Sequence, residues 1–407
     1  MSRRESPAEF HGRSNGRTDG SVEAMRYRTF GKTGKSVSVL GFGCMRLPTL
    51  DGTPDRIDEE RATNMLRTAI DRGVNYVDTA YPYHEGASEP FVGRALSGGG
   101  GYREKTFLAT KLPSWLIEGR DDFDRYLDEQ LERLRTDRID FYLAHALNAA
   151  YWEKLKANGL FDFMDAARAD GRIGHAGFSF HDELPLFREI ADARDWEFCL
   201  IQYNLLDVEF QAGTAGLEYA AEKGMGVAVM EPIRGGKLVD AVPPPAREVW
   251  AEAPIRRTPA EWALRFVWDR PEVGVVLSGM GEMAQLEENL RIAEAAEPGS
   301  LTAGEHALID RVREIYRERM RVACTRCRYC VPCPRGVDIP KILHYLNEWA
   351  MFDDLDAAAM RYNVFVKEGE RASRCEGCGE CEEACPQGLP VRELLAEAEA
   401  HLEAEEA

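Results

Sequence analysis

The sequence predicts an α/β protein in which a closed (β/α)8 barrel, the TIM barrel, precedes a small, mainly α-helical domain. Two observations support this fold class. Eight short apolar runs alternate with amphipathic segments over most of the 407-residue chain, and eight of its ten cysteines fall in two tight groups near the C-terminus. Apolar strands that alternate with helices are typical of a parallel sheet covered on its faces. Eight such units have the size of a closed barrel.

The expected strands are rich in β-branched and aliphatic residues. They are Val37–Gly43, Val74–Ala80, Thr106–Lys111, Ile139–His145, Ile173–Ser179, Phe198–Asn204, Gly226–Pro232 and Val273–Gly279. Helical patterns lie between them, for example over Asp58–Arg72, Asp121–Leu134, Phe161–Asp170 and Thr258–Trp268. An open doubly wound sheet is the alternative, but no Gly-x-Gly-x-x-Gly follows an early strand, so the closed barrel is preferred.

The pattern divides the chain into four parts. Residues 1–24 are polar and without periodicity, so we expect a disordered tail, with Met25 as an alternative translation start. The barrel is expected over residues 25–300. A charged amphipathic helix over 301–321 then links the barrel to a cysteine-rich domain over 322–407.

Shorter features stand inside these parts. Val37–Val39 and the turn-rich Gly31–Lys35 predict a small hairpin ahead of the barrel, and Pro243–Pro245 predict a loop after the seventh strand. The C-terminal domain contains a repeat, because Pro334–Leu343 (PRGVDIPKIL) matches Pro386–Leu395 (PQGLPVRELL). Each copy directly follows a cysteine group, and the segment between the copies has a helical pattern.

The composition excludes several partners. Asp and Glu number 70 against 51 Lys and Arg, and the formal net charge of −19 would repel nucleic acid and anionic lipid. No apolar run approaches the roughly 20 residues of a membrane-spanning helix, and the polar N-terminus lacks the apolar core of an export signal. Clustered thiols without such a signal indicate a reducing compartment, so we expect a cytoplasmic protein.

The clustered cysteines predict iron–sulfur chemistry. Both groups have two or three residues between successive thiols and end in Cys-Pro. Their members are Cys324, Cys327, Cys330 and Cys333, then Cys375, Cys378, Cys381 and Cys385. In the bacterial ferredoxin run of this kind, three thiolates bind one [4Fe–4S] cluster and the fourth binds a second cluster. We therefore predict two [4Fe–4S] clusters with crosswise ligation, in which Cys385 completes the first and Cys333 the second.

Two alternatives to a pair of clusters stay open. Paired Cys-x2-Cys also binds structural zinc, although zinc does not account for four thiols and a proline in each group. The shorter last gap of the first group leaves room for a single cluster. The long helical spacer resembles that of α-helical dicluster ferredoxin modules. Cys44 and Cys199 lie in apolar strands and are expected to be small buried residues.

Four polar residues stand at the ends of three successive expected strands. They are Asp78, Tyr83, Lys111 and His145. Barrel enzymes place their chemistry at the carboxyl ends of the strands. Taken singly, each residue has a structural explanation, as a turn cap, a rim aromatic, a surface charge or a core histidine. Their common position at one rim favours an active site.

The short sequence motifs around these residues resemble those of the aldo/keto reductase family. They are Asp78–Tyr83 (DTAYPY), Thr110–Lys111 (TK), Tyr142–His145 (YLAH), Leu40–Gly43 (LGFG), Ile201–Asn204 (IQYN) and Glu288–Asn289 (EN). The resemblance runs over about residues 25–300 in order and spacing. With the cysteine-rich domain included, the chain resembles the ferredoxin-fused branch of this family. That branch implies an NAD(P)-dependent oxidoreductase with a small-molecule carbonyl or alcohol substrate.

The resemblance assigns roles to the four polar residues. Tyr83 is expected to protonate the carbonyl oxygen as hydride arrives, and to act as the base in the reverse direction. A tyrosine with the ordinary pKa of about 10 is a slow donor at neutral pH. We therefore expect Lys111 to lower that pKa and Asp78 to hold and neutralise Lys111. His145 is expected to donate a hydrogen bond that orients the substrate oxygen.

The resemblance also places a nicotinamide coenzyme at the ends of the later strands. Its carboxamide is expected at Ser179 and Gln202, and the Gly-rich basic loop after the seventh strand suits a pyrophosphate. Two cations that grip the 2′-phosphate in NADP-dependent members are missing here, so NADP is preferred to NAD only slightly. The expected coenzyme residues are Gly43, Ser179, Gln202, Met230, Pro232, Ile233, Arg234, Gly235, Gly279, Gln285, Glu288 and Asn289.

Three functions are compatible with these features. The first couples hydride chemistry in the barrel to electron transfer through the clusters. The second is a plain aldehyde or ketone reductase whose clusters are structural or sense oxygen, and the third is an electron-transfer subunit with a vestigial coenzyme site. Clusters pass single electrons whereas nicotinamide exchanges hydride, and no flavin motif is visible. The substrate, a bound flavin or a redox partner protein would have to connect the two.

Overall fold

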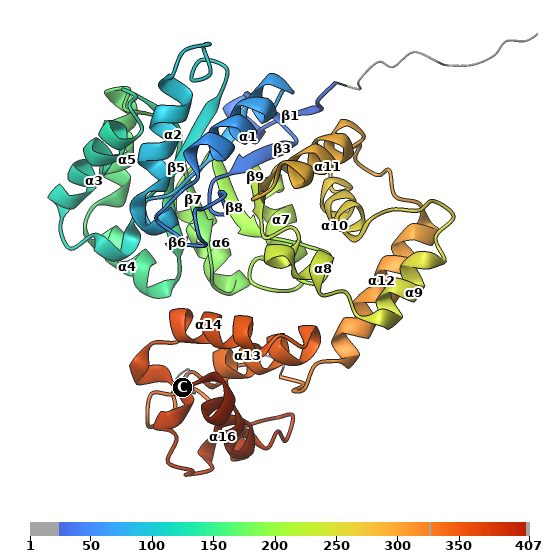
Figure 1. Cartoon of the computed structure of the whole chain (residues 1–407). Coiled ribbons are helices and arrows are strands. Elements are labelled where there is room, and N and C mark those ends of the chain that lie inside the picture. The colour runs from blue at the N-terminus through green and yellow to red at the C-terminus, as the bar shows by residue number, and fades with distance from the viewer. Residues whose placement is uncertain (1–23, 325–326, 404–407) are drawn as a thin grey trace, which may run out of the picture.

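The computed structural model describes residues 24–324 and 327–403. Eight parallel strands form a closed barrel in the order β10-β3-β4-β5-β6-β7-β8-β9, with helices around it and a smaller helical domain after it (Figure 1). The predicted (β/α)8 TIM barrel is therefore confirmed. The expected tail, residues 1–24, lies outside the described residues apart from Ala24.

The barrel strands follow the apolar runs of the sequence. They are β3 (Leu40–Gly43), β4 (Tyr76–Asp78), β5 (Phe107–Leu112), β6 (Ile139–Leu147), β7 (Ile173–Phe180), β8 (Phe198–Gln202), β9 (Gly226–Met230) and β10 (Val273–Gly279). The helices of this part are α1 (Glu59–Asp71), α2 (Ser88–Ser97), α3 (Arg120–Arg133), α4 (Ala149–Ala157), α5 (Leu160–Ala169), α6 (Leu184–Ala193), α7 (Gly213–Glu222), α8 (Lys237–Asp240), α9 (Pro244–Ala251), α10 (Pro259–Trp268), α11 (Met283–Glu294) and α12 (Ala303–Glu318).

An antiparallel hairpin, β1 (Tyr27–Thr29) and β2 (Ser36–Ser38), closes the amino-terminal end of the barrel. It carries the fully buried Phe30, which packs in the aromatic interior of the barrel. A Cβ atom on Gly226 or Gly274, at the start of β9 and β10, would lie 2.7 or 2.5 Å from the Phe30 ring. Only glycine fits there. This closed end leaves the carboxyl ends of the strands as the mouth of the barrel.

The predicted loop at Pro243–Pro245 is wrong, because α9 begins at Pro244 and carries two prolines in its first turn. Proline is accepted at this position since the first amides of a helix have no carbonyl partner and the fixed φ of proline suits the helix. Helix α9 packs against α12, and Arg311 of α12 forms a bidentate ion pair with Glu252 directly after α9.

The C-terminal domain is helical and has its own apolar core. Its helices are α13 (Ile339–Phe352), α14 (Leu355–Phe365), α15 (Glu380–Glu383) and α16 (Val391–Leu402). Helices α13 and α14 lie on the side that faces the barrel, and α16 lies beyond them (Figure 1). The two repeat copies lead into α13 and α16, and each turns through a left-handed glycine, Gly336 (φ 79°) and Gly388 (φ 60°).

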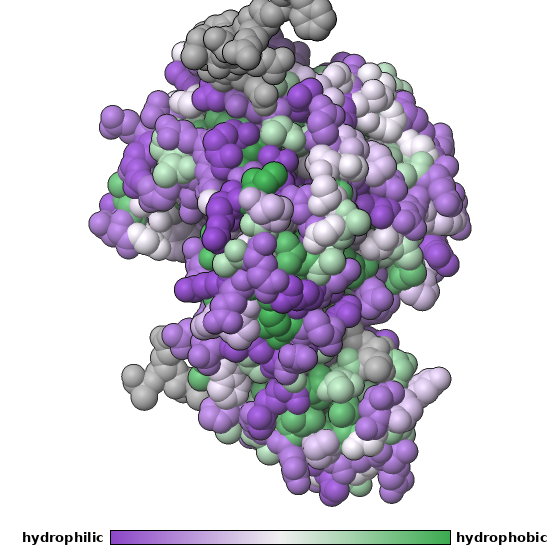
Figure 2. Space-filling view, turned by 90° about the vertical axis from the view of Figure 1, so that its right-hand side faces the viewer, coloured by the Kyte–Doolittle hydropathy of each residue, from purple (hydrophilic) through white to green (hydrophobic). Residues whose placement is uncertain are grey.

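The two domains meet in a narrow junction. Seen from the side, the molecular surface narrows between the large domain above and the small domain below (Figure 2). Asn347 of α13 makes two 2.8 Å hydrogen bonds with the backbone of Val322, where the chain enters the small domain.

None of the helices in the described part of the chain is long and apolar enough to span a membrane.

Candidate functional site

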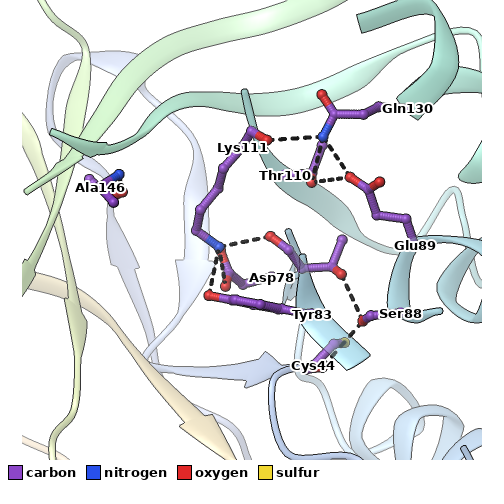
Figure 3. A network of polar contacts seen from close by, with 11 residues as sticks. Cys44, Asp78, Tyr83, Ser88, Glu89, Thr110, Lys111, Gln130 and Ala146 are labelled. Atoms are coloured by element: carbon purple, nitrogen blue, oxygen red, sulfur yellow. Dashed lines mark hydrogen bonds and ion pairs between the residues drawn. The ribbon is translucent and has the colours of Figure 1, made fainter. Parts of the chain in front are cut away.

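A buried ion pair lies at the mouth of the barrel (Figure 3). Lys111, near the end of β5, places its Nζ 2.7 and 2.8 Å from the carboxylate oxygens of Asp78, the last residue of β4. Both side chains are at most 3% exposed. The same Nζ donates to the carbonyl of Thr79 at 2.7 Å and lies 3.4 Å from the hydroxyl of Tyr83. The structure thus brings three of the four predicted catalytic residues into direct contact.

The charges around Tyr83 set its protonation. Burial raises the pKa of Tyr83 above its ordinary value, and the ammonium of Lys111 opposes this rise only in part. The net shift is therefore opposite to the lowering expected from the sequence. Burial also disfavours the charged form of Lys111, but Asp78 and the phenol outweigh it and raise the pKa of the ammonium. Lys111 stays charged and Tyr83 keeps its proton at neutral pH.

His145 reaches the mouth through an irregularity in β6. The pairing of β6 with β7 shifts register between Ala144 and Leu147, and Ala146 adopts a left-handed φ of 53°. Such bulges re-aim side chains next to active sites. The ring of His145 lies 6.3 Å from that of Tyr83, measured between centroids. Burial and the nearby charge of Lys111 hold the pKa of His145 well below its usual value, so the ring is neutral.

The turn that presents Tyr83 carries two strained residues that the sequence analysis missed. His84 and Glu85 both have φ of 53° although neither is glycine. The His84 ring fixes the turn, because its Nε2 accepts the amide of Leu47 at 3.1 Å and its Nδ1 contacts the carbonyl of Pro54 at 2.7 Å. Strain of this kind persists where the surroundings overdetermine the conformation. No sequence signal marks it.

A buried polar network supports Lys111 from behind (Figure 3). Gln130 of α3 donates to the carbonyl of Lys111 at 3.0 Å and to Glu89 of α2 at 2.6 Å. Thr110 donates to the same Glu89 oxygen at 2.7 Å. Polar side chains that are buried and bonded in this way fix the strand that carries the lysine. A glutamine on the buried face of an amphipathic helix was the available signal.

The predicted coenzyme residues stand around one half of the same mouth. Gly43, Gln202, Met230 and Gly279 end the neighbouring strands β3, β8, β9 and β10. The Gln202 amide is held by Asp207, to which it donates at 2.8 Å. These four positions lie at the carboxyl ends of adjacent strands, at the same end of the barrel as Lys111.

Other predicted coenzyme residues have partners inside the protein. The Ser179 hydroxyl accepts the backbone amide of Ala146 at 2.7 Å and so supports the bulge beside His145. Asn289 donates to Ser278 of β10 at 3.0 Å.

Two more of the predicted coenzyme residues lie on α11, and both accept hydrogen bonds from neighbouring residues. Glu288 accepts the hydroxyl of Thr258 at 2.7 Å. Gln285 accepts the amides of Gly281 and Glu282 at 2.9 and 3.2 Å, which caps the start of α11. The coenzyme role of these residues stays a prediction.

The basic loop after β9 differs most from its expected use. Pro232 and Ile233 lead into Arg234, which is 3% exposed and forms ion pairs of 3.0 Å with Asp207 and with Glu348 of α13. Arg234 therefore joins the barrel to the small domain. A cation beside Gly235 comes instead from Arg46 in the loop after β3, which the sequence analysis did not single out.

The cysteines of the small domain gather from two separate segments. Cys324, Cys327 and Cys330 of the first group line one pocket together with Cys385 of the second. Ile339 and Leu343, in the first turns of α13, line the same pocket. The donor set is four thiols against an apolar wall, which fits a [4Fe–4S] cluster ligated crosswise. In the described residues no group of three or more metal-binding side chains converges on a single-ion site.

Fold and site together define an oxidoreductase barrel joined to an iron–sulfur domain. Residues 39–314 match the model of the aldo/keto reductase family, and residues 323–389 match the 4Fe-4S dicluster domain. The chain therefore belongs to the aldo/keto reductase family, and its barrel is followed by a 4Fe-4S dicluster domain. This agrees with the branch that the sequence resembles.

Relatives and a solved structure match 67 to 71% of this chain. The uncharacterized oxidoreductase YqkF of Bacillus subtilis is 26% identical over 67% of this chain and 92% of its own length. L-galactose dehydrogenase of Arabidopsis thaliana is 26% identical over 69% of this chain and 91% of its own. The aldo-keto reductase AKR11C1 of Bacillus halodurans, in its holo form, is 27% identical with a TM-score of 0.59, over 71% of this chain and 96% of that chain.

Proposed function

We propose that the protein interconverts a small-molecule carbonyl compound and its alcohol with a nicotinamide coenzyme, NADP in preference to NAD, at the mouth of the barrel. We further propose that two [4Fe–4S] clusters exchange electrons with this site. The proposal depends above all on the Tyr83 hydroxyl, 3.4 Å from the Lys111 ammonium that Asp78 holds. A buried ion pair is costly to the fold. Proton transfer by the Tyr83 hydroxyl is a functional reason for keeping this costly ion pair beside it.

The residues divide the work of carbonyl reduction between them. The coenzyme, when bound, supplies the hydride. Tyr83 gives its proton to the carbonyl oxygen, and Lys111 stabilises the phenolate that remains. Asp78 keeps Lys111 charged and in place. The neutral ring of His145 orients the substrate oxygen through an N–H donor, and in alcohol oxidation the Tyr83 phenolate accepts the proton.

The course of α13 supports communication between the clusters and the barrel. Its first turns, at Ile339 and Leu343, line the pocket of four cysteines. The next residue, His344, stacks on Phe210 in the loop after β8 with ring centroids 5.2 Å apart. Glu348, one turn further, pairs with Arg234 of the loop after β9. We therefore favour an enzyme with coupled clusters, working in the cytoplasm with a redox partner protein, over a plain reductase.

An anaerobic titration tests this proposal. Protein purified without oxygen should contain about eight iron atoms per chain, since each cluster holds four. One equivalent of NADPH carries two electrons, one for each cluster, and with a catalytic amount of flavin to pass the hydride on as single electrons it should bleach their visible absorbance. If the protein reduces 4-nitrobenzaldehyde while its clusters stay unbleached, it is a plain reductase and not an enzyme with coupled clusters. If dithionite bleaches the clusters, neither NADPH nor NADH does so, and no aldehyde is reduced, the protein is an electron-transfer subunit.

The pH dependence of aldehyde reduction follows from the shifted groups. The pKa of Tyr83 is raised, so the proton needed for reduction is present at neutral pH and is lost only above the ordinary tyrosine pKa of about 10. The pKa of His145 is lowered, so the ring does not titrate near its usual pKa of about 6.5. We expect kcat/KM to be flat within about twofold between about pH 6 and about pH 9. A step near pH 6.5 that His145→Gln removes would contradict this.

A further inference from the structure

The loop after β9 is bound to the small domain through its own basic side chains. Arg234 pairs with the buried Glu348 of α13, which is 1% exposed. The guanidinium of Arg234 and the ammonium of Lys237 lie 5.2 and 5.3 Å from the centroid of the Phe352 ring. Cations at this distance are attracted by the face of an aromatic ring. These two charges are therefore engaged by the small domain.

A different pair of cations meets beside Gly235. This residue has φ of +64°, and a Cβ atom built on it would lie 2.7 Å from Nη2 of Arg46 and 3.4 Å from Nη2 of Arg361. Arg46 comes from the loop after β3, whereas Arg361 comes from α14 of the small domain. A side chain at this position would collide with the Arg46 guanidinium and crowd that of Arg361. Glycine therefore leaves the space beside this loop to the two guanidinium groups.

The neighbouring residues place this space at the mouth of the barrel. The stem of Arg46 lies along Gly279 at the end of β10, where a Cβ atom would be 3.1 Å from Cβ of Arg46. The shared space is thus bounded by the loop after β9 and by the end of β10. Both ends belong to the half of the mouth where Gln202 and Met230 stand.

The charges favour an anion in this space. No hydrogen bond or ion pair joins the Arg46 guanidinium to another of the described residues. Arg361 lies 3.3 Å from Glu348 and 3.8 Å from Glu231, but Glu348 also pairs with Arg234. Two guanidinium groups that approach one point repel each other unless an acceptor stands between them. Phosphate oxygens suit such planar, forked donors.

We propose that Arg46 and Arg361 grip the pyrophosphate of the dinucleotide coenzyme from opposite sides, so that the iron–sulfur domain completes the coenzyme site. This inference rests on the proposed function. Arg361 is then a coenzyme-binding residue that a barrel without the small domain does not have. Coenzyme binding and the docking of the two domains are linked, and each strengthens the other by the same factor.

Equilibrium dialysis of the anaerobic holoprotein tests the proposal. Arg361→Ala and Arg46→Ala should each weaken binding of NADPH and NADH roughly tenfold to a hundredfold, since each removes charge-assisted hydrogen bonds. Arg361→Lys should recover part of the loss. Reduced nicotinamide riboside has no phosphate group, so the variants should bind it as the wild type does. Lys367→Ala is the matched control, because it removes an exposed cation from the same domain, and it should change nothing.

A double variant shows whether the two arginines share one ligand. If both hold the same pyrophosphate, Arg46→Ala with Arg361→Ala should lose less affinity than the product of the single losses. A loss equal to the product, or an equal loss of nicotinamide riboside binding, would overturn the shared grip. Iron content and elution volume report on domain docking, and if Arg361→Ala alters either, Arg361→Lys takes its place in the cycle. Wild-type protein that binds neither dinucleotide contradicts the proposed function itself. Tight binding by wild type and Arg361→Ala alike contradicts only this inference.

Discussion

Replacing Tyr83 by phenylalanine should lower kcat for aldehyde reduction by roughly a hundredfold to ten-thousandfold, the range that a positioned proton donor contributes. The variant keeps the aromatic ring beside His145 and removes only the hydroxyl that contacts Lys111 at 3.4 Å. The carbonyl oxygen then has to take its proton from water. Affinity for NADPH and iron content should stay as in the wild type, because the hydroxyl contacts neither the coenzyme half of the mouth nor the cysteines.

Tyr81→Phe is the matched control for this change. Tyr81 stands two residues away, but its hydroxyl is directed to Glu129 of α3, at 3.3 Å, and not to Lys111. Aldehyde reduction by Tyr81→Phe should stay within about twofold of the wild type. Activity that survives in Tyr83→Phe would show that another group donates the proton. An equal loss in both variants would indicate a structural effect of the turn.

Removing Cys385 should remove one whole cluster and leave the other. Cys385→Ala should lower the iron content from about eight to about four atoms per chain, with about half of the visible absorbance. Cys385 lines a pocket with Cys324, Cys327 and Cys330, so the lost cluster is expected to be the one held by the first cysteine group. Cys199→Ala is the control, because Cys199 is fully buried in β8 and should leave the iron unchanged.

Double variants separate crosswise from local ligation. Under crosswise ligation Cys327 and Cys385 hold the same cluster, so Cys327→Ala with Cys385→Ala should still retain about four iron atoms. Cys378→Ala with Cys385→Ala should retain almost none, since one ligand is lost from each cluster. Local ligation predicts the reverse pair of results. Iron analysis of the two anaerobic double variants therefore decides between the two arrangements.

The sequence predicted the part of the site that depends on strand ends. Asp78 and Lys111 end neighbouring strands, and a closed parallel barrel must bring those ends to one rim whatever the side chains do. Their meeting therefore follows from strand order alone. The structure adds how Lys111 is held, through the buried amide of Gln130, and how Tyr83 is presented, through the turn at His84. These supports depend on side-chain directions and on backbone strain, which no spacing rule encodes.

The sequence misjudged features that depend on what surrounds a residue. The pKa of Tyr83 was expected to fall because of Lys111, but burial outweighs the ammonium and raises it. Pro243–Pro245 suggested a loop, but packing of α9 against α12 makes a helix that begins at Pro244. In both cases the local signal was present, and a stronger contribution came from segments distant in the chain.

By itself the sequence determined two domains, the closed barrel, the two cysteine groups and the polar residues at the strand ends, because periodicity and motif spacing encode these features locally. Only the tertiary structure decided how the domains share the mouth of the barrel. Arg234 was expected to serve a coenzyme and pairs instead with Glu348, while Arg361 of the small domain approaches Gly235. More than a hundred residues separate the partners in each of these contacts. Such contacts form only when the two domains pack against each other, because side chains of opposite charge from distant segments are then brought close together.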